Sequence, residues 1–284
     1  MTLVLIVSFF THRVNAHLYP GPISSSLGEA GIANIDPVEG PFYNPAILPH
    51  LRKEFQTGFV FGQGSTIDTR DDRYWGVMLS DCSKDNYFPA SAAYVSGRTT
   101  FGNFDPADEK YFTLGGGGFA WRQVSFGVSI NRRETQFPTT EKLVQNNFTL
   151  GMIYPFSSNF ALGAIAQNLA NPDGTVPSYL ELPARFGMGV YYVYLQKFHM
   201  RADVTQATRR NPHNQVAYSI GIDSRFAEFF AARLGYHIDN LIDRHVLTAG
   251  IGFLGPRLSL SYGYQVENQN GSGSRHVLDL QMPF

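Results

Sequence analysis

The histidines of this 284-residue chain could do acid–base chemistry, so their placement decides whether a catalytic site is expected. An enzyme built on strands needs its nucleophile and its base on the same face, at the same position along their strands. His199, His237 and His245 are each alone on their strand-like runs, and neither G-x-S-x-G nor H-E-x-x-H occurs. His199 is more simply explained as a hydrogen-bonding side chain in a polar interior. We therefore predict no catalytic residues and no enzymatic activity.

Metal and redox chemistry are equally poorly supported by the sequence. No cluster of His, Cys and Asp has the spacing of metal ligands. Cys82 is the single cysteine, which excludes an intrachain disulfide and leaves a small apolar side chain as the simplest interpretation. The acidic run at 68–72 could hold a cation weakly, but a solvated loop tip is the simpler explanation. We predict no metal and no cofactor.

Charged side chains do recur on the polar faces of strand-like runs. If these runs cross a membrane, an Arg facing lipid near the midplane would cost about 2 to 4 kcal/mol, so the charges should point into a lumen. There they could pair with one another and with Asp36 and Glu39, or they could simply solvate a water-filled interior. The predicted lumen charges are Arg185, Arg201, Asp203, Asp223, Arg233, Arg257 and Asp279.

The elements that must position these charges are strands. From residue 54 onward, runs of about 8 to 12 residues alternate apolar and polar side chains with period two. An even number of such runs, each long enough to cross a bilayer at a tilt, is typical of a bacterial transmembrane barrel. We predict fourteen, at 54–63, 73–82, 88–97, 110–121, 123–132, 144–154, 158–168, 182–193, 197–206, 214–223, 228–237, 244–254, 256–266 and 273–284.

The connections between these runs separate a barrel from a soluble sandwich, which would alternate in the same way. Those after even-numbered runs are short, whereas those after the first, third, fifth and seventh are longer. Short periplasmic turns alternating with longer outer loops are the pattern of outer-membrane barrels, and this parity places both termini in the periplasm. The fold class that we predict is an all-β transmembrane antiparallel barrel.

The composition agrees with this class. With 14% aromatic residues, 28 glycines and 16% charged residues, the chain is too aromatic and too weakly charged for a disordered or long helical protein. A net charge of −1 offers no general attraction to nucleic acid, so no nucleic-acid partner is expected.

One stretch, 24–48, lacks strand-like alternation and is rich in Gly and Ala. Asp36 with Pro37 and Glu39 forms a helix-start signal that could include a capping box, and Asn44-Pro45-Ala46 repeats the device. We expect a compact, partly helical plug buried in the barrel lumen. A helix pair on the surface is the alternative.

This stretch, SLGEAGIANIDPVEGPFYNPAIL, resembles the N-terminal signature of FadL-like outer-membrane barrels, the superfamily that includes the PorV-like proteins. The resemblance implies that 17–50 forms a hatch inside a barrel made by 51–284. A second patch, GAIAQNLANPDG at 163–174, resembles the PorV-like branch. The matching hatch positions are Gly28, Gly31, Ala33, Asp36, Asn44, Pro45, Ala46 and Leu48.

The resemblance leaves two functions open. One is a FadL-like channel that moves hydrophobic small molecules across the outer membrane past a movable hatch. The other is a PorV-like accessory or scaffold barrel that stays sealed and engages other envelope proteins. Gly115 to Gly118 could kink a strand and open the wall, as in FadL itself, or could make room for the hatch.

Both ends of the chain carry targeting features. Leu3 to Phe10 is apolar and Ala16 is a small residue suited to cleavage, which predicts a signal peptide at 1–16, although no Lys or Arg precedes the apolar run. Phe284 ends the last strand-like run and resembles the signal read by the outer-membrane insertion machinery. The expected partners are therefore outer-membrane lipid and that machinery.

Overall fold

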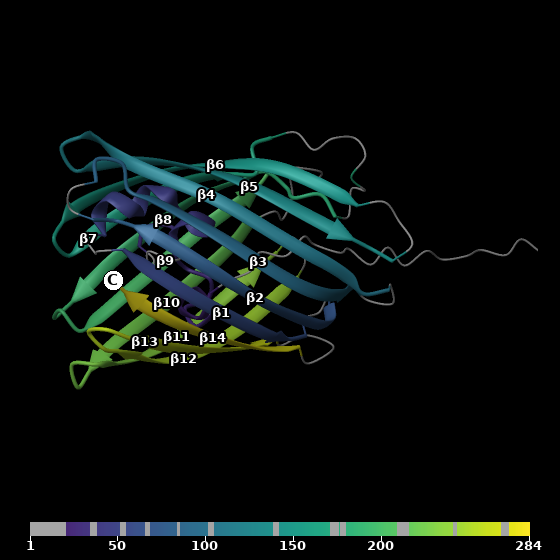
Figure 1. Ribbon diagram of the computed structural model, residues 1–284. Helices are drawn as coiled ribbons and strands as arrows, with labels where there is room; N and C mark the ends of the chain where they lie inside the picture. Colours follow the sequence, from purple (N-terminus) through teal and green to yellow (C-terminus); the bar gives the residue numbers. More distant parts are fainter. Residues whose placement is uncertain are drawn as a thin grey trace, which may run out of the picture.

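The computed structural model is a closed barrel of fourteen antiparallel strands, each hydrogen-bonded to its neighbours in sequence, with β1 closing on β14 (Figure 1). The structure describes residues 21–34, 39–51, 55–65, 69–83, 86–101, 105–138, 142–170, 176, 180–208, 216–240, 243–267 and 273–284. The predicted fold class is confirmed. The signal peptide at 1–16 and Asp36 lie outside the described residues.

The strands correspond one to one with the predicted runs, with boundaries shifted by a few residues. They are β1 (Gln56–Gly64), β2 (Thr69–Asp81), β3 (Ala90–Phe101), β4 (Ala107–Trp121), β5 (Val124–Gln136), β6 (Leu143–Ser157), β7 (Phe160–Gln167), β8 (Arg185–Tyr194), β9 (Phe198–Ala207), β10 (Val216–Phe226), β11 (Phe230–Asp239), β12 (Arg244–Leu254), β13 (Ser259–Glu267) and β14 (Ser274–Pro283).

The two ends of the barrel differ in their connections. Tight turns at 122–123, 158–159, 195–197, 227–229 and 255–258 join strands at the end where the chain finishes, which we call the turn end and which lies on the left in Figure 1. Arg122, Leu195 and Ala227 take positive φ there, as tight turns require. The connections at the opposite end, the loop end, include the long one between β7 and β8.

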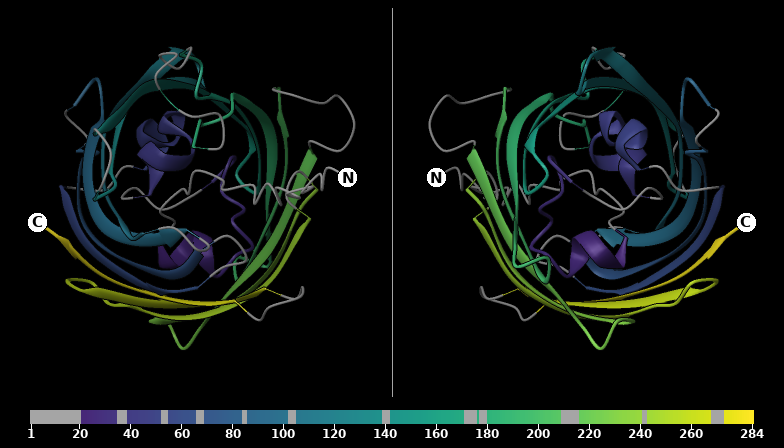
Figure 2. Two further views of the ribbon diagram at one scale, coloured as in Figure 1. Left: turned by 90° about the vertical axis from the view of Figure 1, so that its right-hand side faces the viewer. Right: turned by 90° about the vertical axis from the view of Figure 1, so that its left-hand side faces the viewer.

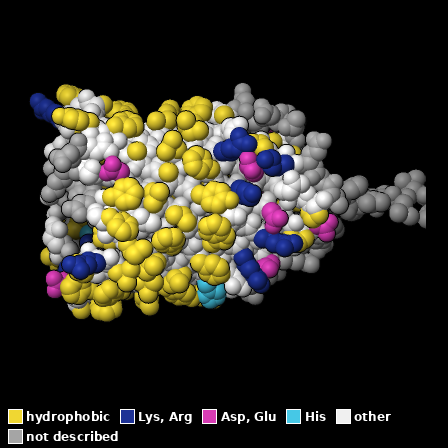
Figure 3. Space-filling model, in the orientation of Figure 1, with side chains coloured by type: hydrophobic (Ala, Val, Ile, Leu, Met, Phe, Trp, Pro, Cys, Tyr) yellow, Lys and Arg dark blue, Asp and Glu magenta, His cyan; other side chains and the backbone are white. Residues whose placement is uncertain are grey.

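Outward side chains form an apolar band around the wall. On β14, Leu278 faces outward with 43% of its surface exposed, whereas the next residue, Asp279, faces inward with 4% exposed. Leu260 and Ser261 on β13 show the same alternation. Figure 3 shows the resulting hydrophobic surface across the middle of the barrel. An exposed apolar band of this extent is a lipid-facing surface.

Three short helices precede the barrel strands: α1 (Pro22–Ser25), α2 (Gly40–Tyr43) and the 3₁₀ helix η1 (Pro45–His50). Figure 2 looks along the barrel and shows them inside the ring of strands. Nearly all their side chains are buried, so the surface-pair alternative does not hold for the described residues. No helix among the described residues is long and apolar enough to cross a membrane.

Candidate functional site

The N-terminal segment, described at residues 21–34 and 39–50, follows the inner wall of the barrel. Helix α1 contacts β12, β13 and β14, whereas α2 contacts β3 and β4, and η1 contacts β4, β5 and β6. The segment therefore touches widely separated strands and lies across the lumen. This makes its contacts with the wall the candidate functional site.

Inward-facing glycines line the wall at many of the places where the segment touches it, and we call them the glycine belt. A Cβ atom on Gly127 would lie 2.4 Å from the backbone N of Ala46, and one on Gly235 would lie 2.2 Å from the backbone N of Gly28. Such distances mean that the backbone of the segment packs directly on the backbone of the wall. The other belt members, each within 3 Å of the segment by the same measure, are Gly117, Gly151, Gly163, Gly187, Gly189, Gly221, Gly250 and Gly263.

Strand register brings these glycines together across the sheet. Gly127 on β5 lies opposite both Gly117 on β4 and Gly151 on β6. Gly221 and Gly235 face each other on β10 and β11 in the same way. Residues that are far apart in sequence therefore form rows of glycine across neighbouring strands of the wall.

The run Gly115 to Gly118 contributes Gly117 to the belt and does not open the wall. All four residues keep an unshifted ladder with β5, and pairing with β3 continues to Gly116. Gly117 receives the segment, while a Cβ on Gly116 would meet the ring of Phe88. Of the two interpretations of this run, the structure supports room for the segment rather than a kink.

Asn44 is the main side-chain link between the segment and the wall. Its Oδ1 accepts from Ala46 N at 3.1 Å and so caps η1, with Pro45 at the first helical position. Its Nδ2 lies 2.7 Å from the carbonyl oxygen of Ile32 and 3.3 Å from that of Met152 on β6. The helix-start signal at 44–46 thus marks a true helix start, although the helix is 3₁₀.

Replacing Asn44 by Ala should loosen this half of the segment. Losing the cap costs about 1 kcal/mol and each lost hydrogen bond about 1 kcal/mol, so we expect seating to weaken by about 2 to 3 kcal/mol. Hydrogen exchange of the 44–50 backbone should then be roughly 30 to 150 times faster. Asn146→Ala, on the outward face of β6, is the matched control and should leave exchange unchanged. Equal exchange in wild type and Asn44→Ala would contradict this role.

Polar side chains of the wall anchor the other half of the segment. Asp203 on β9 accepts from the backbone N of Gly31 at 2.6 Å and of Ile32 at 2.9 Å. Thr248 on β12 accepts from the backbone N of Gly28 at 2.9 Å. Asp203 was predicted as a lumen charge and Gly28 and Gly31 as hatch residues; the structure brings Asp203 to Gly31, and places Gly28 at Thr248.

Glu39 has a different partner from the one that the sequence predicts. Helix α2 begins at Gly40, and the carboxylate of Glu39 accepts from the backbone N of Ile23 and Ser24, each at 3.1 Å. These two N–H groups lie in the first turn of α1, where a helix offers them no partner of its own. Glu39 therefore ties the start of α2 to the start of α1, while Asp36, the other half of the predicted capping box, lies outside the described residues.

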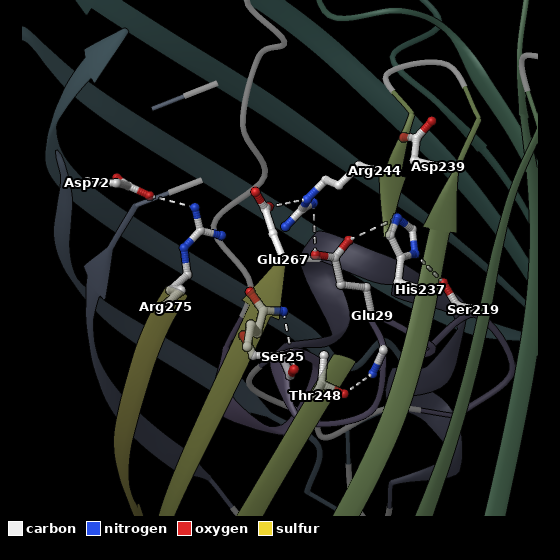
Figure 4. A network of polar contacts seen from close by, with 12 residues as sticks. Ser25, Glu29, Asp72, Ser219, His237, Asp239, Arg244, Thr248, Glu267 and Arg275 are labelled. Atoms are coloured by element: carbon white, nitrogen blue, oxygen red, sulfur yellow. Dashed lines mark hydrogen bonds and ion pairs between the residues drawn. The ribbon is translucent and has the colours of Figure 1, made fainter. Parts of the chain in front are cut away.

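The carboxylate that meets the lumen cations is Glu29, which the sequence interpretation did not single out (Figure 4). Arg244 Nη1 donates to Glu29 Oε1 at 3.4 Å, and His237 Nε2 lies 3.8 Å from Glu29 Oε2. Arg244 is also paired with Glu267, while His237 Nδ1 lies 2.9 Å from Ser219 Oγ. Burial raises the pKa of Glu29, but the positive charges around it, His237 and Arg244 first, outweigh burial and lower the pKa to about 2.

The remaining predicted lumen charges divide into paired and misplaced residues. Arg185 lies 3.6 Å from Asp239, and Arg233 lies 3.8 Å from Asp223. Arg201 is buried with its guanidinium 5.8 Å from the ring centre of Tyr191, and Asp279 accepts from Gln281 at 2.7 Å. Arg257 was wrongly placed in the lumen, because it is exposed in the turn between β12 and β13.

Two buried ion pairs were missed. Arg275 on β14 donates to Asp72 on β2 at 2.7 Å, and Arg133 on β5 pairs with Glu109 on β4. Asp72 was assigned to a solvated loop tip, but β2 starts at Thr69 and carries Asp72 inward. If the predicted strand had been extended by four residues toward the N-terminus, the same period-two alternation would have placed Asp72 on the inward face.

An apolar cluster lies between the segment and the β1 to β4 side of the wall. Phe42 stacks on Tyr111, with ring centres 5.6 Å apart. Ile47 and Phe42 belong to one buried cluster with wall residues that include Tyr74 and Met78. The segment thus covers an apolar inner surface.

Among the described residues, no group of three or more His, Cys, Asp and Glu side chains could hold a metal ion.

Comparisons with known proteins identify the fold through structure. No protein-family model and no curated protein sequence matches the chain. The Ralstonia pickettii toluene transporter TbuX matches with a TM-score of 0.73 at 13% identity, over 93% of this chain and 98% of that one. The Pseudomonas putida toluene transporter TodX matches with a TM-score of 0.73 at 14% identity, over 96% and 100%. A Pseudomonas aeruginosa FadL homologue matches with a TM-score of 0.63 at 12% identity, over 95% and 100%.

The chain has a FadL-like fold. At these identities the likeness concerns the fold of an outer-membrane barrel and does not by itself assign a substrate. The three structures do not support the PorV-like branch specifically.

His50 and Glu29 make the seating of the segment in this FadL-like barrel sensitive to pH. Burial lowers the pKa of His50 to about 4 from its usual 6.5; its Nε2 lies 2.7 Å from Ser125 Oγ. Between pH 6.5 and 4, His50 binds a proton when the segment is released but not when it is seated. Protonation therefore favours the released state, and seating weakens as pH falls through this window. The lowered pKa of Glu29 stabilises seating above pH 4.5, and this contribution is lost as pH falls toward 2.

We therefore expect ionic leak through the barrel to rise in two steps on acidification. Planar-bilayer conductance measured from pH 7 to pH 3 tests this. His50→Gln should remove the upper step and Glu29→Gln the acid dependence of the lower one. A conductance that does not change with pH would contradict the expectation.

Proposed function

We propose that this protein is an outer-membrane channel for hydrophobic small molecules, closed in this structure by the N-terminal segment acting as a hatch. Two solved structures of similar fold, TbuX and TodX, are toluene transporters, which supports hydrophobic cargo. The observation that carries the proposal is the buried apolar cluster on the inner wall, in which Tyr74, Met78 and Tyr111 are grouped with side chains of the segment and Tyr111 stacks on Phe42.

This wall has the chemistry of a hydrophobic route. Movement of α2 and η1 would uncover apolar side chains on neighbouring strands, and a hydrophobic cargo could replace the side chains of Phe42 and Ile47 there. The ion pairs of Asp72 with Arg275 and of Glu109 with Arg133 lie nearer the loop end on the same strands. Entry would therefore lead from a polar vestibule to an apolar passage.

Uptake by the intact protein tests the proposal. Host cells that lack a FadL-like barrel would be supplied with this protein and then given labelled toluene or a labelled long-chain fatty acid. We expect faster initial uptake of at least one probe than in cells with the empty vector. Met78→Asn should reduce that gain because it places an amide in the apolar wall, whereas Asn146→Ala should not. No gain with either probe would contradict a transport role.

The glycine belt favours a second candidate, a sealed accessory barrel of PorV-like type. A segment whose backbone packs on the backbone of the wall would lose many packing contacts if it moved. This function would give no uptake by intact protein although the barrel conducts once the segment is removed. Its partners would be other envelope proteins.

The targeting of the protein is proposed along with its function. The mature chain would start at His17 after cleavage of a signal peptide, and both termini would lie in the periplasm with the loop end outside. N-terminal sequencing of membrane-derived protein and surface proteolysis of intact cells are the corresponding tests.

A further inference from the structure

A row of polar side chains crosses the outer face of the barrel near the loop end. Cross-strand register aligns His276 on β14 with Gln63 on β1, Gln63 with Arg73 on β2, and Arg73 with Arg98 on β3. Inward-facing Asp72 and Tyr74 flank Arg73, so Arg73 points outward. Figure 3 shows charged side chains gathered beyond the hydrophobic band on this side of the molecule.

The pairing of Arg73 with Arg98 is unfavourable by itself. Like charges directly opposite each other on antiparallel strands destabilise the sheet. Asp71 lies 3.2 Å from Arg73 Nε and Asp108 lies 4.0 Å from Arg98 Nε, but the side chains are about half to two-thirds exposed, so these pairs contribute little. Both carboxylates approach the arginine at its Nε, and Arg73 donates to Asp71 from that atom. Lys110 and Arg132 add positive charge on the outward faces of β4 and β5; Glu134 lies opposite Lys110 in register and pairs with Arg132 at 2.8 Å.

A groove beside this arginine pair has the shape and polarity of a site for an amphiphile. It encloses about 640 Å³ on the outer face of β1, β13 and β14. Phe61, Tyr262 and Leu278 give it apolar surface, and Gln63, Ser274 and His276 give it polar groups. Because neighbouring strands are about 4.8 Å apart, the groove begins one strand away from Arg73.

We propose that Arg73 and Arg98 bind the phosphate of an anionic membrane lipid, with one of its acyl chains lying in the groove at Phe61, Tyr262 and Leu278. The phosphate would separate the two guanidinium groups and accept from their η nitrogens, as charge-assisted hydrogen bonds favour. Trp75, which follows Arg73 on the outward face and is 52% exposed, would lie beside the acyl chains. This site does not depend on whether the barrel transports anything.

Quenching of Trp75 by brominated lipid tests the proposal. The chain has two tryptophans, so Trp121→Phe leaves Trp75 as the reporter. The barrel would be reconstituted in phosphatidylcholine with brominated phosphatidic acid or, in parallel, brominated phosphatidylcholine. We expect phosphatidic acid to bind about 30-fold more strongly than phosphatidylcholine, since each arginine at a membrane surface contributes about fivefold.

Two variants and one competitor make the result decisive. Arg73→Gln with Arg98→Gln should abolish the preference, whereas Lys197→Gln with Arg257→Gln, exposed at the turn end, should keep it. Heat-dependent gel mobility would verify that both variants form the barrel. Equal quenching by the two lipids in the parent protein, or an unchanged preference in the arginine variant, would overturn the proposal. Loss of the preference in excess inorganic phosphate would mean that the site takes the free ion, which would also overturn it.

Discussion

Deleting residues 24–48 should turn a barrel with no resolved current into one that gives stepwise single-channel conductance. The segment lies across the lumen and contacts strands on opposite sides, whereas the ring of strand hydrogen bonds closes without it. We expect the deletion variant to fold in the membrane, because its lipid-facing band is unchanged. Planar-bilayer recording of the deletion variant against the intact protein is the measurement.

The control for this experiment is the state of the barrel. Heat-dependent gel mobility should show a folded barrel in both proteins, so that the current reflects the lumen and not a damaged wall. Equal conductance of the two folded proteins would mean that the segment does not block the barrel, and the hatch interpretation would be wrong. Conductance on deletion together with hydrocarbon uptake by the intact protein supports the channel. Conductance on deletion without uptake supports the sealed accessory barrel.

Filling the glycine belt should release the segment without removing any of it. Gly127→Ala and Gly235→Ala each place a methyl group within 2.5 Å of backbone atoms of the segment, and such overpacking costs about 1 to 3 kcal/mol. Together they should favour the released state by about 2 kcal/mol or more, which is roughly 30-fold in the equilibrium constant. A larger effect is expected if the two halves of the segment come away together.

The released state can be counted by labelling a buried position. Ser25 is fully buried and its hydroxyl has no hydrogen-bond partner, so Ser25→Cys with Cys82→Ser gives one reporter thiol. Labelling by a water-soluble maleimide should be about 30 times faster in the double glycine variant. Gly118→Ala is the matched control, because its Cβ would meet its nearest neighbour, Phe88, at an ordinary 3.6 Å. Equal labelling rates in all three proteins would show that the belt does not hold the segment.

Local chemistry determined much of this fold. Period-two alternation in the sequence predicts strand number and faces, because each strand must present apolar side chains to lipid and polar ones to the lumen. The start of η1 was also predictable, since Asn44 and Pro45 act on donors within a few residues. At Asp72 and Arg257, an error of a few residues in the predicted strand boundary was enough to misassign burial. Asp72 was expected in an exposed loop but is buried, and Arg257 was expected in the lumen but is exposed.

Tertiary structure alone decided how the segment is held. Glu39 finds its donors in Ile23 and Ser24, about sixteen positions away, and Glu29 meets Arg244 across 215 positions. In the sequence, each belt glycine is an isolated position that would only be expected to weaken its own strand. Cross-strand register is what places these glycines beside one another. Closure of the ring fixes that register and brings these groups against the segment, and no local pattern in the chain encodes the distance between strands that are remote in sequence.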